Sequence, residues 1–191
     1  FCPSTGGVKS LRAMSYHPAT GAMYIPLNLH CETAEFLPVE KREGGGGTGG
    51  VRERQNHFHP DSPGQLGEFQ ALDIRTGETL WKNRRRAPYN TAALTTAGDL
   101  VFVGDLDRYI FAYDAETGET RWQSRLTTMA NGYPITYAVD DTQYVAFVAG
   151  NPLGGASWAA TVPNDLLPEL RNPRNAGNAI FVFALPEGDS E

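Results

Sequence analysis

Two histidines on one short segment are the first residues whose types and spacing suggest chemistry. His57 and His59 flank Phe58, so on a strand both imidazoles would point to the same side and could form part of a metal site. The sequence around them offers no third ligand, neither a cysteine nor a carboxylate, at a known zinc-site spacing. We therefore favour a solvated loop for this segment.

Cys2 and Cys31 are the only cysteines in the sequence. Two cysteines among 191 residues are compatible with two unrelated thiols. They are also compatible with one disulfide, which would indicate an oxidising compartment. The residues alone leave both interpretations open.

Two other segments resemble binding motifs but are more simply explained as loops. The glycine run from Gly44 to Gly50 is followed by Val51 rather than by Gly-Lys-Ser/Thr, so it is not a phosphate-binding loop. The cationic run Lys82–Arg86 suggests a solvent-facing loop, with an acidic partner surface as the alternative. The sequence contains no Gly-x-Ser-x-Gly, His-Glu-x-x-His or Cys-x-x-Cys motif, which argues against the common hydrolase, zinc-protease and thiol-redox signatures.

Composition narrows the class of protein further. The chain is 40% hydrophobic and 20% charged, which is typical of a globular protein. Its net charge of −6 disfavours nucleic acid as a partner. No apolar run approaches the roughly 18–20 residues of a transmembrane helix. Because the chain begins with Phe1 and shows no leader pattern, we expect a mature chain, a cut chain or a fragment.

An internal repeat defines the elements that must position these residues. Residues 71–81 recur as residues 112–122, with seven of eleven positions identical, and residues 16–24 give a weaker echo in which tyrosine replaces the final tryptophan. A period of about 40 residues is typical of β-propeller blades. In each copy an aromatic strand runs into Asp-x-x-Thr-Gly, a turn motif, and a second strand then carries the tryptophan.

This pattern predicts an all-β fold. We expect a partial β-propeller of about three to four blades, each a four-stranded antiparallel sheet, in which Trp81 and Trp122 are buried and dock one blade on the next. The alternative is a generic β-hairpin with an incidental tryptophan. Further strands are predicted at residues 100–104, 135–139, 143–149 and 179–185, and a short helix at residues 163–170 with Asn164 as its N-cap. Residues 43–66 are predicted to be a glycine-rich loop insertion, and residues 150–178 an irregular excursion.

The combination of motifs resembles the C-terminal part of the pyrroloquinoline quinone (PQQ)-dependent alcohol dehydrogenases of the methanol dehydrogenase type. The resemblance covers nearly the whole chain apart from the two loops. It rests on residues 2–7, 16–21, 28–31, 94–102, 104–107, 114–122, 132–137, 143–146 and 181–186.

The resemblance implies an eight-bladed propeller that holds PQQ and a Ca²⁺ or lanthanide ion on its axis. It also implies a disulfide between Cys2 and Cys31. The family's catalytic aspartate and metal ligands precede the first cysteine motif, so we assign no catalytic or metal-binding residue to this chain. Ser10, Tyr89, Asn90 and Trp158 stand near the positions of the family's cofactor contacts, and we expect them to contact PQQ.

Two functions of different classes follow. The first is the C-terminal segment of a periplasmic PQQ-dependent dehydrogenase that converts small-molecule alcohols to aldehydes, needs the upstream propeller blades and passes electrons to a cytochrome c. The isolated chain is then expected to be inactive. The alternative is a non-enzymatic scaffold or binding propeller of the outer-membrane assembly type, which uses the same tryptophan repeat without a cofactor.

Overall fold

A computed structural model describes residues 1–9, 12–38, 50–150, 165–170 and 177–184. Strands dominate this part of the chain, and Asp165 and Leu166, from the predicted helix, are helical. No helix in the described ranges is long and apolar enough to cross a membrane. The strands are β1 (Ser15–His17), β2 (Ala22–Asn28), β3 (His30–Phe36), β4 (Val51–Phe58), β5 (Gly67–Asp73), β6 (Thr79–Arg85), β7 (Leu94–Thr96), β8 (Leu100–Gly104), β9 (Tyr109–Asp114), β10 (Thr120–Arg125), β11 (Ala130–Val139), β12 (Thr142–Ala149) and β13 (Ala179–Ala184).

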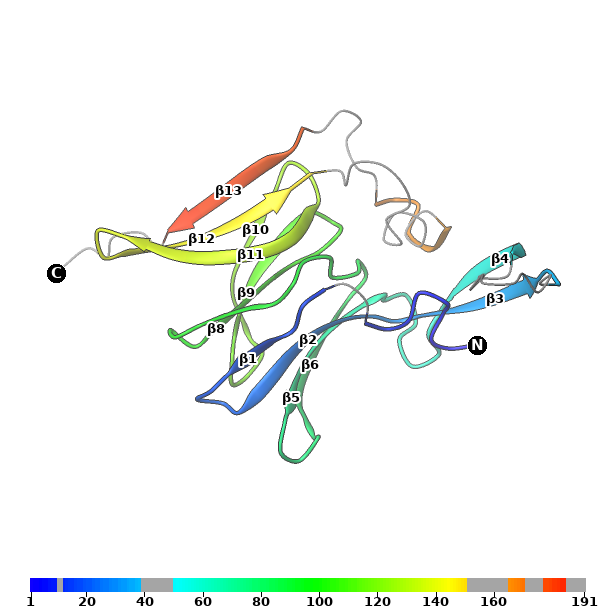
Figure 1. Cartoon of the computed structure of the whole chain (residues 1–191), viewed down its shortest axis with the longest axis horizontal. Coiled ribbons are helices and arrows are strands. Elements are labelled where there is room, and N and C mark those ends of the chain that lie inside the picture. Colours follow the sequence, from blue (N-terminus) through cyan, green and yellow to red (C-terminus); the bar gives the residue numbers. More distant parts are fainter. Residues whose placement is uncertain (10–11, 39–49, 151–164, 171–176, 185–191) are drawn as a thin grey trace, which may run out of the picture.

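Three antiparallel sheets follow one another along the chain (Figure 1). The first sheet has the order β1-β2-β5-β6, the second β7-β8-β9-β10 and the third β11-β12-β13. The strands that open the three sheets lie side by side, since β7 contacts both β1 and β11. The fold is therefore all-β and forms an arc of propeller blades, as predicted, although the described part of the third blade has three strands instead of four.

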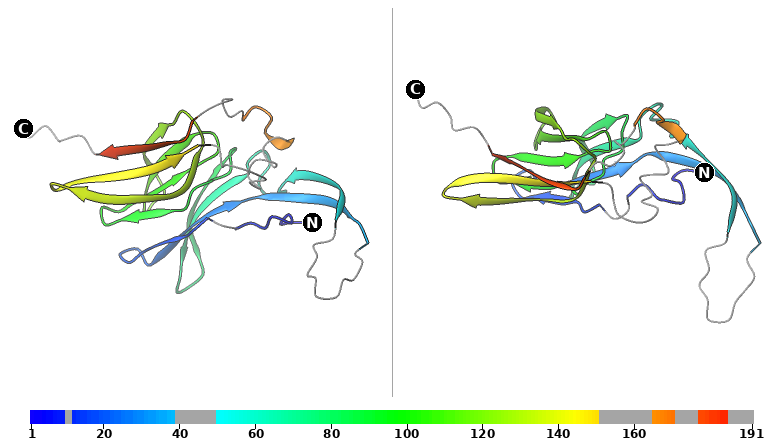
Figure 2. Two further views of the ribbon diagram at one scale, coloured as in Figure 1. Left: turned by 45° about the horizontal axis from the view of Figure 1, so that its top comes forward. Right: turned by 90° about the horizontal axis from the view of Figure 1, so that it is seen from above.

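The prediction of a loop over residues 43–66 was wrong for its second half. Residues 51–58 form β4, which pairs with β3 in a separate hairpin that reaches away from the three sheets (Figure 2). The strand was missed because its charged side chains suggest a solvated loop, whereas they pair across the hairpin. Arg52 pairs with Glu35, and Arg54 Nε lies 2.6 Å from Glu32 Oε1. Residues 39–49, which include most of the glycine run, lie outside the described residues, as does most of the 150–178 excursion.

The cationic run is also a strand rather than a loop. Lys82 to Arg85 belong to β6, and carboxylates neutralise the arginines of the run. Arg84 pairs with Glu68 at 2.6 Å, Arg85 with Asp105 at 3.0 Å, and Arg86 with Glu169. Paired arginines can lie along a strand at little electrostatic cost, which the run of like charges in the sequence did not reveal.

The repeat motif closes the two hairpins β5–β6 and β9–β10 as predicted. Asp73 accepts hydrogen bonds from the backbone amides of Arg75 and Thr76, and Asp114 does the same in the second copy. Gly77 and Gly118 both have a φ of 75°, which an L-residue adopts only with strain. The hairpin of Asp140 and Asp141 between β11 and β12 is confirmed as well.

The weaker echo at residues 16–24 is not a third copy of this motif. It spans the β1–β2 hairpin of the first sheet, whereas both true copies join the third and fourth strands of their sheets. The likeness arises because this turn also needs a glycine with positive φ, Gly21 at 66°.

An aromatic core joins the first sheet to the second. Trp81 donates its indole N–H to the carbonyl of Ala115 at 3.0 Å, and the Tyr24 hydroxyl donates to the same oxygen at 2.8 Å. A Cβ atom on Gly118 would lie 2.6 Å from the Trp81 ring, so the ring lies against the turn of the next blade. The predicted docking role of Trp81 is confirmed, although its side chain is partly buried and not buried as predicted.

Trp122 does not reach the position that Trp81 occupies. Its side chain remains 37% exposed and contacts Phe183 edge to face, with ring centroids 5.0 Å apart. A cavity of about 450 Å³ lies beside it between the second and third sheets. The prediction that Trp122 is buried was therefore wrong: Phe183 of the third sheet covers only part of the ring. Residues 185–191, which follow β13, lie outside the described residues.

Candidate functional site

Antiparallel pairing gives the arc two unlike ends. Tight turns at residues 18–21, 74–78, 97–99, 115–119 and 140–141 occupy one end. The connections at residues 29–66, 86–93, 105–108, 126–129 and 150–178, among them the three longest, all leave from the other end. Loops on a rigid scaffold are where binding groups gather, so the second end is the place to look for a site.

Asn90 ties the three blades together at this end. Its backbone amide donates to the Gly104 carbonyl of the second sheet at 2.8 Å. Its side-chain amide donates to the carbonyl of Ala130, the first residue of the third sheet, at 2.7 Å. Its Oδ1 accepts a hydrogen bond from Arg12, which precedes β1, at 3.1 Å. Asn90 is thus held by all three blades and positions Arg12.

Arg12 is the functional candidate that sequence reasoning missed. Its Nε is buried without a hydrogen-bond partner, and within the described ranges no carboxylate lies in ion-pair contact with its guanidinium. Burial lowers the pKa of Arg12 to about 10, so the group is still charged at neutral pH. A partly buried cation without a counter-ion favours an anionic ligand. The only signal in the sequence was its place two residues after Ser10.

Tyr89 lies in the core rather than at an open surface. Its side chain is fully buried, and its hydroxyl lies 2.9 Å from that of Tyr113. Burial and the neighbouring Tyr113 raise the pKa of Tyr89 well above its usual value. Its ring packs on Phe69 and Phe111, so we assign it a packing role and do not keep it among the proposed cofactor contacts.

The other two predicted contacts, Ser10 and Trp158, lie outside the described residues. Asn90 is therefore the one member of the predicted set that the described part places beside a candidate ligand-binding group.

A buried ion pair lies at the same end of the arc, between the first and second sheets. Asp105 has no exposed surface, and its Oδ2 lies 3.0 Å from Arg85 Nε. This ion pair joins the second blade to the first. Desolvation raises the pKa of Asp105 to about 6, although Arg85 opposes the shift. The Arg85 guanidinium also lies 4.2 Å from the centroid of the Phe111 ring. The pair is an internal link between blades.

The bridge between Cys2 and Cys31 is present, with the two Cα atoms 4.4 Å apart. It ties the N-terminal segment to β3, in the extended connection between β2 and β5. His57 and His59 do not converge on one point, because the His57 ring bonds to Thr33 while the Asp61 amide donates to His59. The pair of histidines therefore does not form the partial metal site considered from the sequence.

Comparison with known proteins agrees with the geometry. Residues 66–145 match the family model of the glucose/ethanol/alcohol dehydrogenase β-propeller domain that carries PQQ. The chain is 31% identical to a quinoprotein ethanol dehydrogenase of Pseudomonas putida, over 99% of this chain and 29% of that protein. It is also 31% identical to a lanthanide-dependent methanol dehydrogenase of Methylorubrum extorquens, over 97% of this chain and 32% of that protein.

A solved structure gives the same result. A europium-containing methanol dehydrogenase superposes with a TM-score of 0.77 at 27% identity, covering 97% of this chain and 34% of that chain. The chain spans about a third of the length of these relatives. By sequence and by fold, it is similar to a segment of the β-propeller of PQQ-dependent alcohol dehydrogenases.

Proposed function

We propose that this chain is the C-terminal part of a PQQ-dependent dehydrogenase that oxidises alcohols to aldehydes. The observation that carries the proposal is Arg12, a partly buried cation that makes no ion pair with any residue the structure describes, beside the Asn90 junction of three blades. The relatives named above, a quinoprotein ethanol dehydrogenase and a lanthanide-dependent methanol dehydrogenase, support the same reaction class.

The residues present fit such a cofactor. PQQ is a planar quinone that carries three carboxylates, and a guanidinium binds a carboxylate through two parallel N–H groups. Arg12 would bind a carboxylate of PQQ, while Asn90, anchored on the Ala130 carbonyl, would fix the guanidinium in position. When bound, PQQ supplies the two-electron oxidant.

In this proposal the rest of the chemistry belongs to a longer parent protein. The proton-accepting aspartate and the ligands of a Ca²⁺ or lanthanide ion would come from preceding blades. The third sheet supports a longer parent, because one of its faces presents exposed apolar side chains: Ile180 is 71% exposed and Ile135 56%. A further blade packed on this face would cover them.

The disulfide supports a periplasmic location, because such bridges persist in oxidising compartments. We further propose a cytochrome c as the electron acceptor. The support is a relative named methanol dehydrogenase [cytochrome c] subunit 1 from Methylorubrum extorquens, which is 32% identical over 97% of this chain and 31% of that protein.

PQQ binding by the full parent protein tests the proposal. We expect Arg12→Gln to weaken PQQ binding at least tenfold in equilibrium dialysis and Arg12→Lys to weaken it less, because lysine keeps the charge but loses the two-pronged geometry. Arg52→Gln is the matched control, since Arg52 is an exposed arginine paired with Glu35 on the β3–β4 hairpin. Equal PQQ binding by Arg12→Gln and the control would remove Arg12 from the site. Alcohol-dependent dye reduction by the isolated chain would contradict its being part of a larger enzyme.

A further inference from the structure

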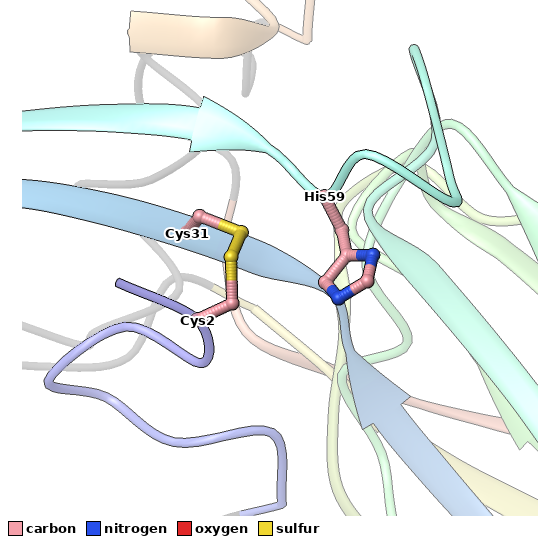
Figure 3. Close-up of side chains that lie close together, drawn as sticks. All are labelled: Cys2, Cys31 and His59. Atoms are coloured by element: carbon pink, nitrogen blue, oxygen red, sulfur yellow. A yellow bond between two sulfur atoms is a disulfide. The ribbon is translucent and has the colours of Figure 1, made fainter.

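Three potential metal ligands meet outside the site described above. The Sγ atoms of Cys2 and Cys31 and a ring nitrogen of His59 all lie within 4.8 Å of one another. Figure 3 shows the imidazole beside the sulfur–sulfur bond, with the three side chains coming from three separate segments. Cys31 is buried, His59 is partly buried and Cys2 is exposed, so one side of the cluster is open to solvent. Two sulfurs and one imidazole are a donor set typical of Zn²⁺ sites that keep a fourth position for water.

The backbone keeps the two cysteines adjacent independently of their bond. On one side of Cys2, Glu32 donates its amide to the Phe1 carbonyl at 2.9 Å. On the other side, Ser4 donates its amide to the His30 carbonyl at 3.1 Å. Thr5 adds two hydrogen bonds to the buried Glu32 carboxylate. The N-terminal segment therefore runs along β3 through several contacts, and the two thiols of the reduced chain would remain neighbours.

His59 is oriented to complete the set. The Asp61 amide donates to its Nδ1 at 3.1 Å, so the neutral ring carries its proton on Nε2, and a metal can bind Nε2 once that proton has moved to Nδ1. The Asp61 carboxylate lies 3.9 Å from the same Nδ1, so it can accept a hydrogen bond once that nitrogen carries the proton. A carboxylate behind a ligating histidine is the usual arrangement at zinc sites.

We propose that the reduced form of this chain binds one Zn²⁺ ion through Cys2, Cys31 and His59, with water as the fourth ligand. The ligand atoms of such a site lie roughly 3.5 Å apart, so only a small displacement of the exposed Cys2 is needed. The newly made chain carries both thiols before the bridge forms. In the oxidised chain, a dithiol restores them by supplying two electrons and two protons to the sulfur–sulfur bond and itself becomes a disulfide. Zn²⁺ then releases both thiol protons to solvent.

Zinc and the bridge use the same sulfur atoms, so they exclude each other. The site therefore exists only in the reduced state and delays formation of the bridge while Zn²⁺ is bound. Because the sequence contains only these two cysteines, no other thiol can account for sulfur ligation.

Metal titration of the full 191-residue chain tests the proposal, with Co²⁺ as the spectroscopic probe and Zn²⁺ as its competitor. After anaerobic reduction and removal of the reductant, we expect one Co²⁺ per chain, a thiolate-to-cobalt absorption band, and displacement by one Zn²⁺. His59→Gln should weaken binding at least tenfold. His57→Gln is the matched control, because His57 lies on the neighbouring strand and bonds to Thr33, and it should change the affinity less than twofold. Zn²⁺ should also slow reoxidation of the thiols at least tenfold.

Each other outcome contradicts the proposal. Failure of the reduced chain to bind Co²⁺ or Zn²⁺ would overturn it, and equal affinities of the two histidine variants would remove His59 from the site. Should reduction unfold the chain, addition of Zn²⁺ must restore the β-sheet circular dichroism. Binding without that recovery would show that the ion is held by an unfolded chain and not by this geometry.

Discussion

The two interfaces between blades are built from the same repeat yet differ in completeness. At the first interface, Trp81 lies on the turn of the next blade and shares the Ala115 carbonyl with Tyr24. At the second, Trp122 contacts Phe183 beside a cavity and keeps 37% of its surface exposed. Trp81 is thus anchored on a turn of the following blade, whereas the described contact of Trp122 is with a strand, β13. The motif alone does not determine the burial of its tryptophan.

The largest expected effect comes from removing the two tryptophans in turn. Trp81→Ala should lower the free energy of unfolding by about 3–5 kcal/mol, because it leaves a cavity among Tyr24, Phe69 and Tyr113. Trp122→Ala should cost about 1–2 kcal/mol, since part of its ring already faces solvent. Urea denaturation followed by circular dichroism measures both variants. Equal losses would contradict the difference between the interfaces.

The glycines of the repeat offer a matched pair. Gly118→Ala should cost about 2–4 kcal/mol, because the new methyl group meets the Trp81 ring and the backbone has a φ of 75°. Gly77→Ala has the same φ and no atom within 4 Å of the new Cβ, so only the backbone cost of about 1–2 kcal/mol should apply. Comparing the urea midpoints of the two variants isolates the contribution of docking. Similar midpoints would show that backbone strain, and not the contact with the Trp81 ring, accounts for the stability lost in Gly118→Ala.

The ion pair of the first interface predicts a dependence on pH. The second interface has the apolar Leu126 where the repeat places Arg85 in the first. Burial raises the pKa of Asp105 from 3.8 to about 6, so between these values the folded chain binds more protons than the unfolded chain. The contribution of this group to stability is greatest below about pH 4 and falls as the pH rises through 6, by at most about 1.4 kcal/mol per pH unit.

Urea midpoints measured from pH 4 to 7 test this behaviour, and Asp105→Asn should remove the slope. Asp114 titrates in a separate range: hydrogen bonds from Arg121 and from the turn lower its pKa to about 2, so its stabilisation is lost only as the pH falls below 3.8. A slope that persists in Asp105→Asn would assign the effect to another group.

The smallest effect concerns a single hydrogen bond. Tyr24→Phe removes the hydroxyl that donates to Ala115 and should cost about 1 kcal/mol. Tyr144→Phe is the control, because Tyr144 stacks on Tyr137 in the third sheet and takes no part in docking. Thermal unfolding should separate the two variants by a few degrees. A larger loss in Tyr144→Phe would mean that the third sheet, and not the first interface, limits stability.

The sequence predicted the features that depend on local patterns and missed those that depend on contacts made only in the folded chain. Repeat spacing and turn chemistry are local, so they identified the β5–β6 and β9–β10 hairpins and the docking of Trp81. Strand β4 was missed because ion pairs across its hairpin, not apolar alternation, accompany its pairing. Arg12 was missed for a related reason: what distinguishes it is a buried Nε that makes no hydrogen bond within the described part of the chain, and only the folded arrangement shows which groups have partners.

Strand β13 has a consequence for handling the chain at the bench. Among the described strands it pairs with β12 alone, so one edge of its backbone is open, and Ile180 and Val182 are exposed along it. Such an edge is a template on which a strand from another molecule can add. Samples of the chain should therefore associate as their concentration rises, and light scattering should grow faster than linearly with concentration. A lysine in place of Val182 should raise the concentration at which the solution stays clear.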